Sequence, residues 1–184
     1  ALVGMLVISE KLPALPPAAP VVRAIDIGQG DALLLQGRDG RSLLCDAGPP
    51  GSSRSLVRTL RALRVGRPDA LLISHTDADH VGGLQRLCAE LPPRLLIHSA
   101  QTEDAEGWAE VAKTAVNHGI PLLAAEAGDR IRIGASTLTI LGPLSPGGTS
   151  DNEASLVARW DSSGARVLLT GDIGRETERG LLTW

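Results

Sequence analysis

The sequence predicts a single α/β domain in which two packed β-sheets carry helices on their outer faces. In residues 21–118, short apolar runs alternate with segments of helical period. From residue 121 to residue 169 the pattern becomes one of successive strands separated by turns. The length of 184 residues suits one domain with a sizeable core.

Composition separates the first twenty residues from the rest, so we expect residues 21–184 to form the domain. Residues 1–20 hold the apolar run at residues 2–8 and the proline-rich segment LPALPPAAP. We interpret them as a linker or the stump of a transmembrane segment, because seven apolar residues cannot span a bilayer that needs about 20. A first strand of the domain is the alternative.

The early strands are apolar runs that end in turn residues. Residues 21–27 end at a turn with two glycines, and residues 32–36 and 41–46 flank an Asp-Gly hairpin signal. The second of these strands carries Asp46 into a Gly-Pro turn. Later strands are expected at residues 69–74, 94–98, 121–123, 130–133, 136–141, 154–160 and 165–169.

Helices are expected where apolar residues repeat at a period near 3.6. Leu56, Val57, Leu60 and Leu63 share one face of a helix at residues 53–65. Pro92 and Pro93 end the next helix. The other predicted helices are residues 82–91, 106–118 and 173–182.

The loop after the strand at residues 69–74 contains the candidate metal ligands. Within six positions it holds His75, Asp77, Asp79 and His80, and two glycines follow. In an extended loop, residues two apart project to the same side, so the first three can converge on one point while His80 turns toward a neighbouring one. Imidazole nitrogen and carboxylate oxygen bind Zn²⁺, and added carboxylates favour harder ions such as Mn²⁺. The alternative is a polar loop around a buried histidine.

The motif HTDADHVGG at residues 75–83 resembles HxHxDH, the second motif of the metallo-β-lactamase fold hydrolases, with aspartate at the second ligand position. Three further stretches are IDIGQGDA at residues 25–32, LLCDAGP at residues 43–49 and LLTGDI at residues 168–173. With them, residues 21–184 are similar to the β-lactamase-like domain of the ComEC competence proteins, which take up DNA. The order and spacing of four motifs make the resemblance specific.

The resemblance implies an αββα four-layer sandwich that is a hydrolase with two divalent metal ions, Mn²⁺ or Zn²⁺. The ligands it implies are His75 and Asp77 for a first metal, Asp79 and His80 for a second, and Asp172 between the two. Asp79 is also the expected catalytic residue, which orients the attacking hydroxide. Two such ions lower the pKa of a bridging water and stabilise the attacking and leaving oxygens.

Two aspartates, Asp46 and Asp31, are expected beside the metals, where they support the ligands. Asp46 has the alternative of an ordinary turn aspartate, and Asp172 that of a helix N-cap. The third motif usually supplies a histidine where this chain has Ser-Asp-Asn-Glu, so Asp151 or Asn152 is the substitute. The histidine of the fifth motif would lie beyond Trp184, so we expect the chain to be truncated at its C-terminus or the site to be incomplete.

Charge and composition restrict the partners. The net charge of −3 argues against a broad polyanion-binding surface, and the 2 % of aromatic residues exclude a row of stacking platforms for single strands. The exposed face of the helix at residues 53–65 still offers an arginine stripe for phosphates, although such a stripe is typical of a solvated face. Its members are Arg54, Arg58 and Arg61.

The remaining metal-binding residue types are assigned to structural roles. Cys45 and Cys88 are isolated thiols, expected in the core on a strand and on a helix. His98 is expected on a strand, and His118 is expected to end a helix. We therefore do not expect any of these four side chains to bind metal.

The first functional hypothesis is a DNA nuclease, a phosphodiesterase, that acts in natural transformation. Its expected partners are single-stranded DNA and a membrane channel portion of the same or another polypeptide, and the domain is otherwise monomeric. The resemblance places it at the cell membrane on the extracytoplasmic side. A catalytically silent domain that guides DNA and a small-molecule hydrolase of the same fold are the alternatives, because one fold hosts many chemistries.

Overall fold

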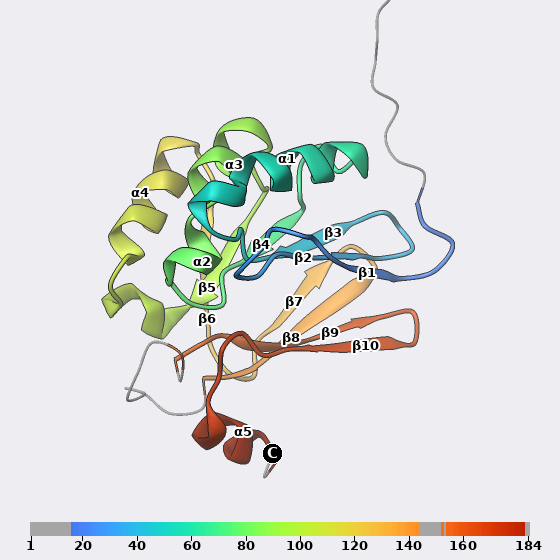
Figure 1. Ribbon diagram of the computed structural model, residues 1–184. Coiled ribbons are helices and arrows are strands. Elements are labelled where there is room, and N and C mark those ends of the chain that lie inside the picture. The colour runs from blue at the N-terminus through green and yellow to red at the C-terminus, as the bar shows by residue number, and fades with distance from the viewer. Residues whose placement is uncertain (1–15, 144–151, 153, 183–184) are drawn as a thin grey trace, which may run out of the picture.

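The computed structural model describes residues 16–143, 152 and 154–182. Within them, strands form two sheets that pack face to face (Figure 1). The first sheet, in spatial order, contains β1 (Val21–Ala24), β2 (Leu33–Gln36), β3 (Ser42–Cys45), β4 (Ala70–Leu72), β5 (Leu96–Ser99) and β6 (Leu122–Ala125). The second contains β10 (Ala165–Leu169), β9 (Val157–Ser162), β8 (Ser136–Gly142) and β7 (Arg130–Ile133).

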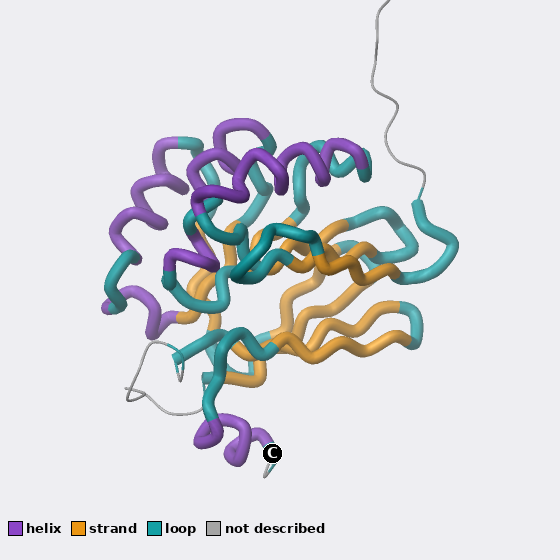
Figure 2. Tube along the Cα trace, viewed as in Figure 1, coloured by secondary structure: helices purple, strands orange, loops and turns teal. Residues whose placement is uncertain are grey.

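Helices cover the outer faces of this pair of sheets (Figures 1 and 2). One side of the first sheet carries α1 (Ser53–Ala62), α3 (Leu84–Glu90) and α4 (Trp108–Asn117). Beyond the second sheet lies α5 (Arg175–Leu181). Three shorter helical segments are α2 (Ala78–Val81), η1 (Pro50–Ser52) and η2 (Ala100–Asp104). The layers follow the order α, β, β, α, which confirms the predicted sandwich.

The first sheet is buried on both faces, which explains why its strands read as nearly continuous apolar runs. One row of paired residues across β2 to β5 packs under the helices and consists of Leu34, Leu44, Leu71 and Leu96. The next row, Leu35, Leu43 and Ala70, faces the second sheet. Successive side chains of a strand thus enter two different cores.

The order and direction of the strands place the loops. Strands β3, β4, β5 and β6 run parallel, while β1 and β2 are antiparallel additions at the edge. The carboxyl ends of the parallel strands therefore share one edge, where open α/β sheets commonly hold their sites. The loops after β3 and β4, which carry Asp46 and His75, both lie at that edge.

The predicted elements are confirmed in type, with shorter bounds at several ends. β7 and β10 match residues 130–133 and 165–169, and the turn at Gly40 has the positive φ, 78°, that the hairpin requires. The strand at Leu122–Ala125 belongs to the first sheet, because it continues the parallel series beyond β5. Cys45 and Cys88 are buried and free, and burial raises the pKa of both thiols, as core positions require.

One prediction about the metal loop is wrong. The loop does not stay extended to His80, because α2 begins at Ala78 with Asp77 as its N-cap residue. The helix predicted at residues 82–91 is α3, and Gly82 and Gly83 separate it from α2.

The N-terminal prediction falls mostly outside the described residues, which begin at Pro16. In the part of the chain that the structure describes, no helix is long and apolar enough to cross a membrane.

Candidate metal centre

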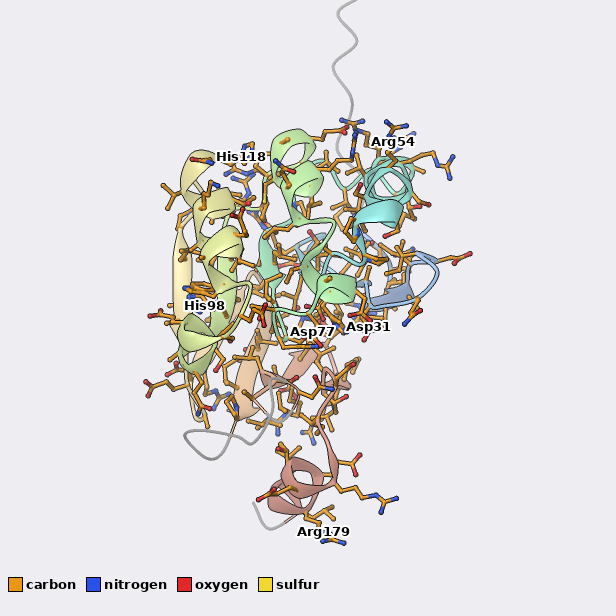
Figure 3. All side chains as sticks on the ribbon, turned by 60° about the vertical axis from the view of Figure 1, so that its left-hand side comes forward. Asp31, Arg54, Asp77, His98, His118 and Arg179 are labelled. Carbon is orange, nitrogen blue, oxygen red and sulfur yellow. The ribbon has the colours of Figure 1, made fainter. Side chains whose placement is uncertain are left out.

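Side chains from both sheets meet at the carboxyl edge of the parallel strands. Asp46 follows β3, His75 follows β4, His80 lies on α2, and Asp172 follows β10 of the second sheet. Figure 3 shows Asp31 and Asp77 on the side of the helical layer that faces the second sheet. Residues distant in the sequence are thus brought to one place by the packing of two sheets.

Asp46 is the hydrogen-bonding centre of this group. Its side chain is buried, and its backbone is left-handed, with a φ of 59°, which aspartate tolerates better than most residues. Its Oδ1 accepts the Ser74 backbone N–H at 2.9 Å, and its Oδ2 accepts the Ser74 hydroxyl at 2.7 Å. The same Oδ2 lies 3.1 Å from Nδ1 of His80. An ordinary turn aspartate would not be buried with this set of partners.

These hydrogen bonds define the tautomers of the neutral histidines. Because a carboxylate only accepts hydrogen bonds, His80 carries its proton on Nδ1 and leaves the lone pair of Nε2 free. The Ser74 hydroxyl donates its one proton to Asp46, so Ser74 Oγ accepts from Nδ1 of His75, 3.0 Å away. His75 therefore also leaves its Nε2 lone pair free. Asp46 orients one histidine directly and the other through Ser74.

The Nε2 atoms of both histidines lie close to a further atom that could bind a metal ion. Nε2 of His75 is buried and has no hydrogen-bond partner among the residues that the structure describes, an arrangement that costs free energy unless a cation binds there. Nε2 of His80 lies 3.6 Å from Oδ2 of Asp172. One ligand atom each from His75, His80 and Asp172 lies within 4.8 Å of the others. Two imidazole nitrogens and one carboxylate oxygen suit Zn²⁺ or a similar divalent ion.

A second group of possible ligand atoms adjoins the first and shares His80. It consists of Asp31, Asp46 and His80, again within 4.8 Å of one another. Asp31 and Asp46 of this group border a cavity of about 150 Å³ that Ser74 and Gly171 also line. The structure thus places Asp31 and Asp46 beside the histidines.

The two aspartates of the motif lie at the rim. Asp77 is exposed, and its Oδ2 lies 3.5 Å from the free Nε2 of His75. Asp79 is partly buried in the first turn of α2, next in sequence to His80. Among the described residues, neither belongs to the two groups of closely spaced ligand atoms. The helical turn separates the Asp79 carboxylate from the point on which an extended loop would have placed it.

Close backbone contacts hold α2 in place. Gly30, with a φ of 99°, packs against Asp79, and a Cβ there would overlap the Asp79 backbone oxygen. Asp31 N also donates to that oxygen at 3.4 Å. On the other side, Ala47 N donates to His80 O at 2.7 Å. The IDIGQGDA and LLCDAGP stretches therefore position the helix that carries His80.

The other residues that the sequence singled out for or against the site lie as follows. Asp172 is not a helix N-cap, because Gly174 occupies that position of α5. Asn152 is exposed, and Asp151 lies outside the described residues. His98 stacks on Trp108, with ring centroids 4.2 Å apart, and burial lowers its pKa. His118 is the exposed C-cap of α4.

The arginine stripe lies elsewhere. Arg54, Arg58 and Arg61 are exposed on α1, and Arg61 pairs with Glu90 at 2.8 Å. Figure 3 shows Arg54 on the outer side of the helical layer, away from Asp31 and Asp77.

Sequence reasoning missed Ser74 as a functional residue. Its hydroxyl links Asp46 to His75, residues that lie 29 positions apart in the sequence. The available signal was a hydroxyl residue directly before the first histidine in an otherwise apolar strand.

The histidine protonation predicts how stability changes with pH. Burial lowers the pKa of His80, but its hydrogen bond to Asp46 and the charges of Asp46, Asp172 and Asp79 together raise it from 6.5 to about 9 in the metal-free protein. This raised pKa stabilises the metal-free fold below about pH 6.5, and the contribution disappears as the pH rises through about 9. The free energy of unfolding should therefore fall by about 3 kcal/mol between these limits.

Urea denaturation of the chelator-treated protein at several pH values measures this fall. His80→Gln should remove the pH dependence, whereas His118→Gln, at the exposed end of α4, should retain it. A free energy of unfolding that is constant from about pH 6 to about pH 9 would contradict the assignment.

The fold and the candidate metal centre together indicate a class of protein. Two packed sheets with outer helices, and a histidine and aspartate centre at their edge, are the features of a metal-dependent hydrolase. The chain belongs to the Metallo-beta-lactamase superfamily, whose family model matches residues 25–184. This superfamily typically binds divalent metal ions, often zinc.

Two curated relatives carry competence names. ComE operon protein 3 of Bacillus subtilis (strain 168) is 27 % identical over 178 residues, which is 88 % of this chain and 23 % of the relative. Competence protein ComA of Neisseria gonorrhoeae is 30 % identical over 176 residues, 95 % of this chain and 23 % of the relative. The chain thus spans about a quarter of their length. The resemblance to the ComEC competence proteins is confirmed at this modest identity.

A solved structure supports the fold. A metallo-β-lactamase from Cronobacter sakazakii with an HARLDQ motif superimposes with a TM-score of 0.62 at 23 % identity. The match covers 85 % of this chain and 63 % of that structure.

Proposed function

We propose that this domain is a metal-dependent phosphodiesterase that cuts DNA as part of a ComEC-like DNA-uptake protein. One observation supports it above the others: the buried Nε2 of His75, which has no hydrogen-bond partner in the described part of the chain, lies in a group with His80 and Asp172. The similarity to competence proteins supports the choice of DNA as substrate. From the resemblance to the ComEC competence proteins, we further propose single-stranded DNA as the substrate, a membrane channel as the partner and an extracytoplasmic position at the membrane.

The proposed ligand assignment is the one that the family resemblance implies, and two observed distances are compatible with it. His75 and Asp77, with 3.5 Å between Nε2 and Oδ2, would hold a first metal ion. His80 and Asp79 would hold a second, with Asp172 between them, since its Oδ2 lies 3.6 Å from Nε2 of His80. When bound, such ions supply Lewis acidity for the phosphate oxygens and for an attacking water.

The chain's own groups have separate tasks in this proposal. Asp46 and Ser74 keep the Nε2 lone pairs of both histidines directed into the centre. Asp79, at the rim and partly exposed, orients the attacking water and accepts its proton. The cavity beside Asp31 and Asp46 leaves room at the centre for part of a substrate.

Metal dependence of DNA cleavage tests the proposal. The protein is stripped with a chelator, and cleavage of a fluorescent single-stranded oligonucleotide is followed after Mn²⁺ or Zn²⁺ is restored. We expect Mn²⁺ to support cleavage at least as well as Zn²⁺, because Asp77 supplies a hard, charged oxygen where the related motif has a neutral imidazole.

The alternatives give different results in the same assay. Cleavage only with Zn²⁺ would make the metal preference wrong. Bound metal without DNA cleavage, but with hydrolysis of a lactam or thioester, would indicate a small-molecule hydrolase. Oligonucleotide binding without any hydrolysis would indicate a domain that guides DNA.

A further inference from the structure

A second charged site lies at the amino edge of the parallel strands, opposite the metal centre. A cleft of about 320 Å³ opens there beside the starts of β3 and β4. Four arginines line it, Arg41, Arg64, Arg67 and Arg94, together with Asp39 and Asp69. Because β3, β4 and β5 run parallel, their amino ends share this edge. The stretch from Ser42 to Asp46 spans about 13 Å, so the cleft and the centre are separate sites.

Both aspartates of the cleft already make hydrogen bonds that hold the fold together. Asp69 accepts the Ser42 backbone N–H at 2.9 Å, pairs with Arg41 at 2.7 Å and lies 3.5 Å from Nε of Arg94. Asp39 accepts the backbone N–H groups of Arg41 and Ala135. Asp69 therefore holds two arginines in position, and four cations face two anions. The cleft retains an excess of positive charge.

Arg64 is the most informative of these residues. It follows α1 with a φ of 57°, and Val65 N donates to Leu60 O at 2.8 Å, which is the helix ending that usually employs glycine. An arginine in this conformation costs free energy relative to glycine. No ion pair or side-chain hydrogen bond of Arg64 is found among the described residues. Its cost to the fold and its free guanidinium indicate a role in binding.

The arginines of α1 continue the charged surface from the cleft along the outer side of the helical layer. This helix begins after the Asp46 loop, at the carboxyl edge, and ends at the cleft. Arg54 and Arg58 are exposed on it, and Arg61 lies about one turn before Arg64. A linear series of cations matches a polymer with regularly spaced charges better than a single small anion. Duplex DNA carries one phosphate per about 3.4 Å of each strand.

We propose that this arginine cleft binds the phosphate backbone of a nucleic acid strand and that the exposed arginines of α1 continue the contact along the outer side of the helical layer. The identity of the polymer rests on the proposed function, whereas the binding does not require catalysis. Arginine suits the role because its guanidinium makes paired hydrogen bonds to phosphate oxygens.

The experiment uses Arg64→Gly, because glycine suits the left-handed backbone and the variant should be at least as stable as the wild type. Binding of a fluorescein-labelled single-stranded oligonucleotide is measured by anisotropy in chelator, at several salt concentrations. We expect about tenfold weaker binding, and a slope of log affinity against log salt that is smaller by about 0.7. Two control variants each remove one positive charge elsewhere: Lys113→Ser on α4 and Arg179→Ser on α5. Figure 3 shows Arg179 far from Arg54. Neither control should change the affinity or the slope.

The proposal would be overturned by unchanged affinity and slope in Arg64→Gly, by equal losses in the two controls, or by inorganic phosphate competing as well per phosphate as unlabelled oligonucleotide. Stronger binding to phosphatidylglycerol vesicles than to the oligonucleotide would assign the cleft to a lipid surface and also overturn it. Mn²⁺-dependent hydrolysis of bis(4-nitrophenyl) phosphate is measured in parallel. If that hydrolysis persists while oligonucleotide binding is unaffected by Arg64→Gly, the cleft proposal fails and the phosphodiesterase proposal stands.

Discussion

Asp172→Asn is expected to lower the rate of phosphodiester hydrolysis about 10³-fold, because a neutral amide replaces the carboxylate between the two proposed metal ions. Charge stabilisation by such ions contributes several kcal/mol to a transition state, and each 1.4 kcal/mol changes the rate about tenfold. Asp172 is also the carboxylate that the second sheet supplies to the group with His75 and His80. Its loss should affect both metals together.

The stability of this variant should change little. The Asp172 side chain is 44 % exposed, and it is not the N-cap of α5. Its interaction with His80 is a 3.6 Å contact at the surface of the site. Asparagine has nearly the same shape, so the loss of rate would not arise from unfolding.

The measurement is kcat for oligonucleotide cleavage at saturating Mn²⁺, together with thermal unfolding. Asp129→Asn is a matched control, because it removes one exposed negative charge and keeps the oxygen that accepts the Glu126 N–H at 3.0 Å. The control should cleave at the wild-type rate. An Asp172→Asn variant with more than about a tenth of the wild-type kcat would show that this carboxylate does not hold the metals.

The fold was predictable because its signals are local and repeated. The apolar strands at Leu43–Leu44 and Leu71–Leu72 appear as continuous runs, since both faces of the first sheet are buried. The helical period of α1 is equally clear, with Leu56, Val57 and Leu60 all buried. Each of these elements is long enough, or apolar enough, to be identified from its own residues.

The short helix in the metal loop was not predictable in the same way. α2 has four residues, too few to show a period. Its position depends on backbone contacts with the loop after β3 and with Gly30, which are distant in the sequence. The one local signal for this helix was Asp77 at the N-cap position, but the sequence motif assigned that residue as a metal ligand instead.

The hydrogen-bond network of Asp46 and Ser74 could not be predicted from the sequence either. Asp46 and Ser74 meet because β3 and β4 pair in parallel with Cys45 opposite Leu72, so the residues after each strand lie side by side. The motif identified the histidines, but the choice of nitrogen that faces the metal depends on this pairing. The structure thus turns a list of candidate ligands into two oriented ones.

Asp46→Asn tests that orientation, and we expect it to weaken metal binding about 10-fold to 100-fold. Asparagine keeps the left-handed backbone, whose φ is 59°, because it tolerates that conformation as aspartate does. However, its NH₂ group must face a donor whichever way the amide points: either the Ser74 N–H, or the Ser74 hydroxyl and the His80 Nδ1–H. In the first orientation the NH₂ group opposes the Ser74 N–H, and in the second His80 favours the other tautomer, whose Nε2–H cannot bind a metal.

Competition with a chelating indicator measures the metal affinity of Asp46→Asn, and the ¹⁵N shifts of the histidine rings report the tautomers. Asp69→Asn is the matched control, because that carboxylate accepts a backbone N–H from Ser42 at the other end of the same pair of strands, and its partners in the described residues include no histidine. It should lose stability without losing metal affinity. If Asp46→Asn bound metal as tightly as Asp69→Asn, the histidines would be oriented by packing alone, and the carboxylate would serve only to close the buried loop after β3.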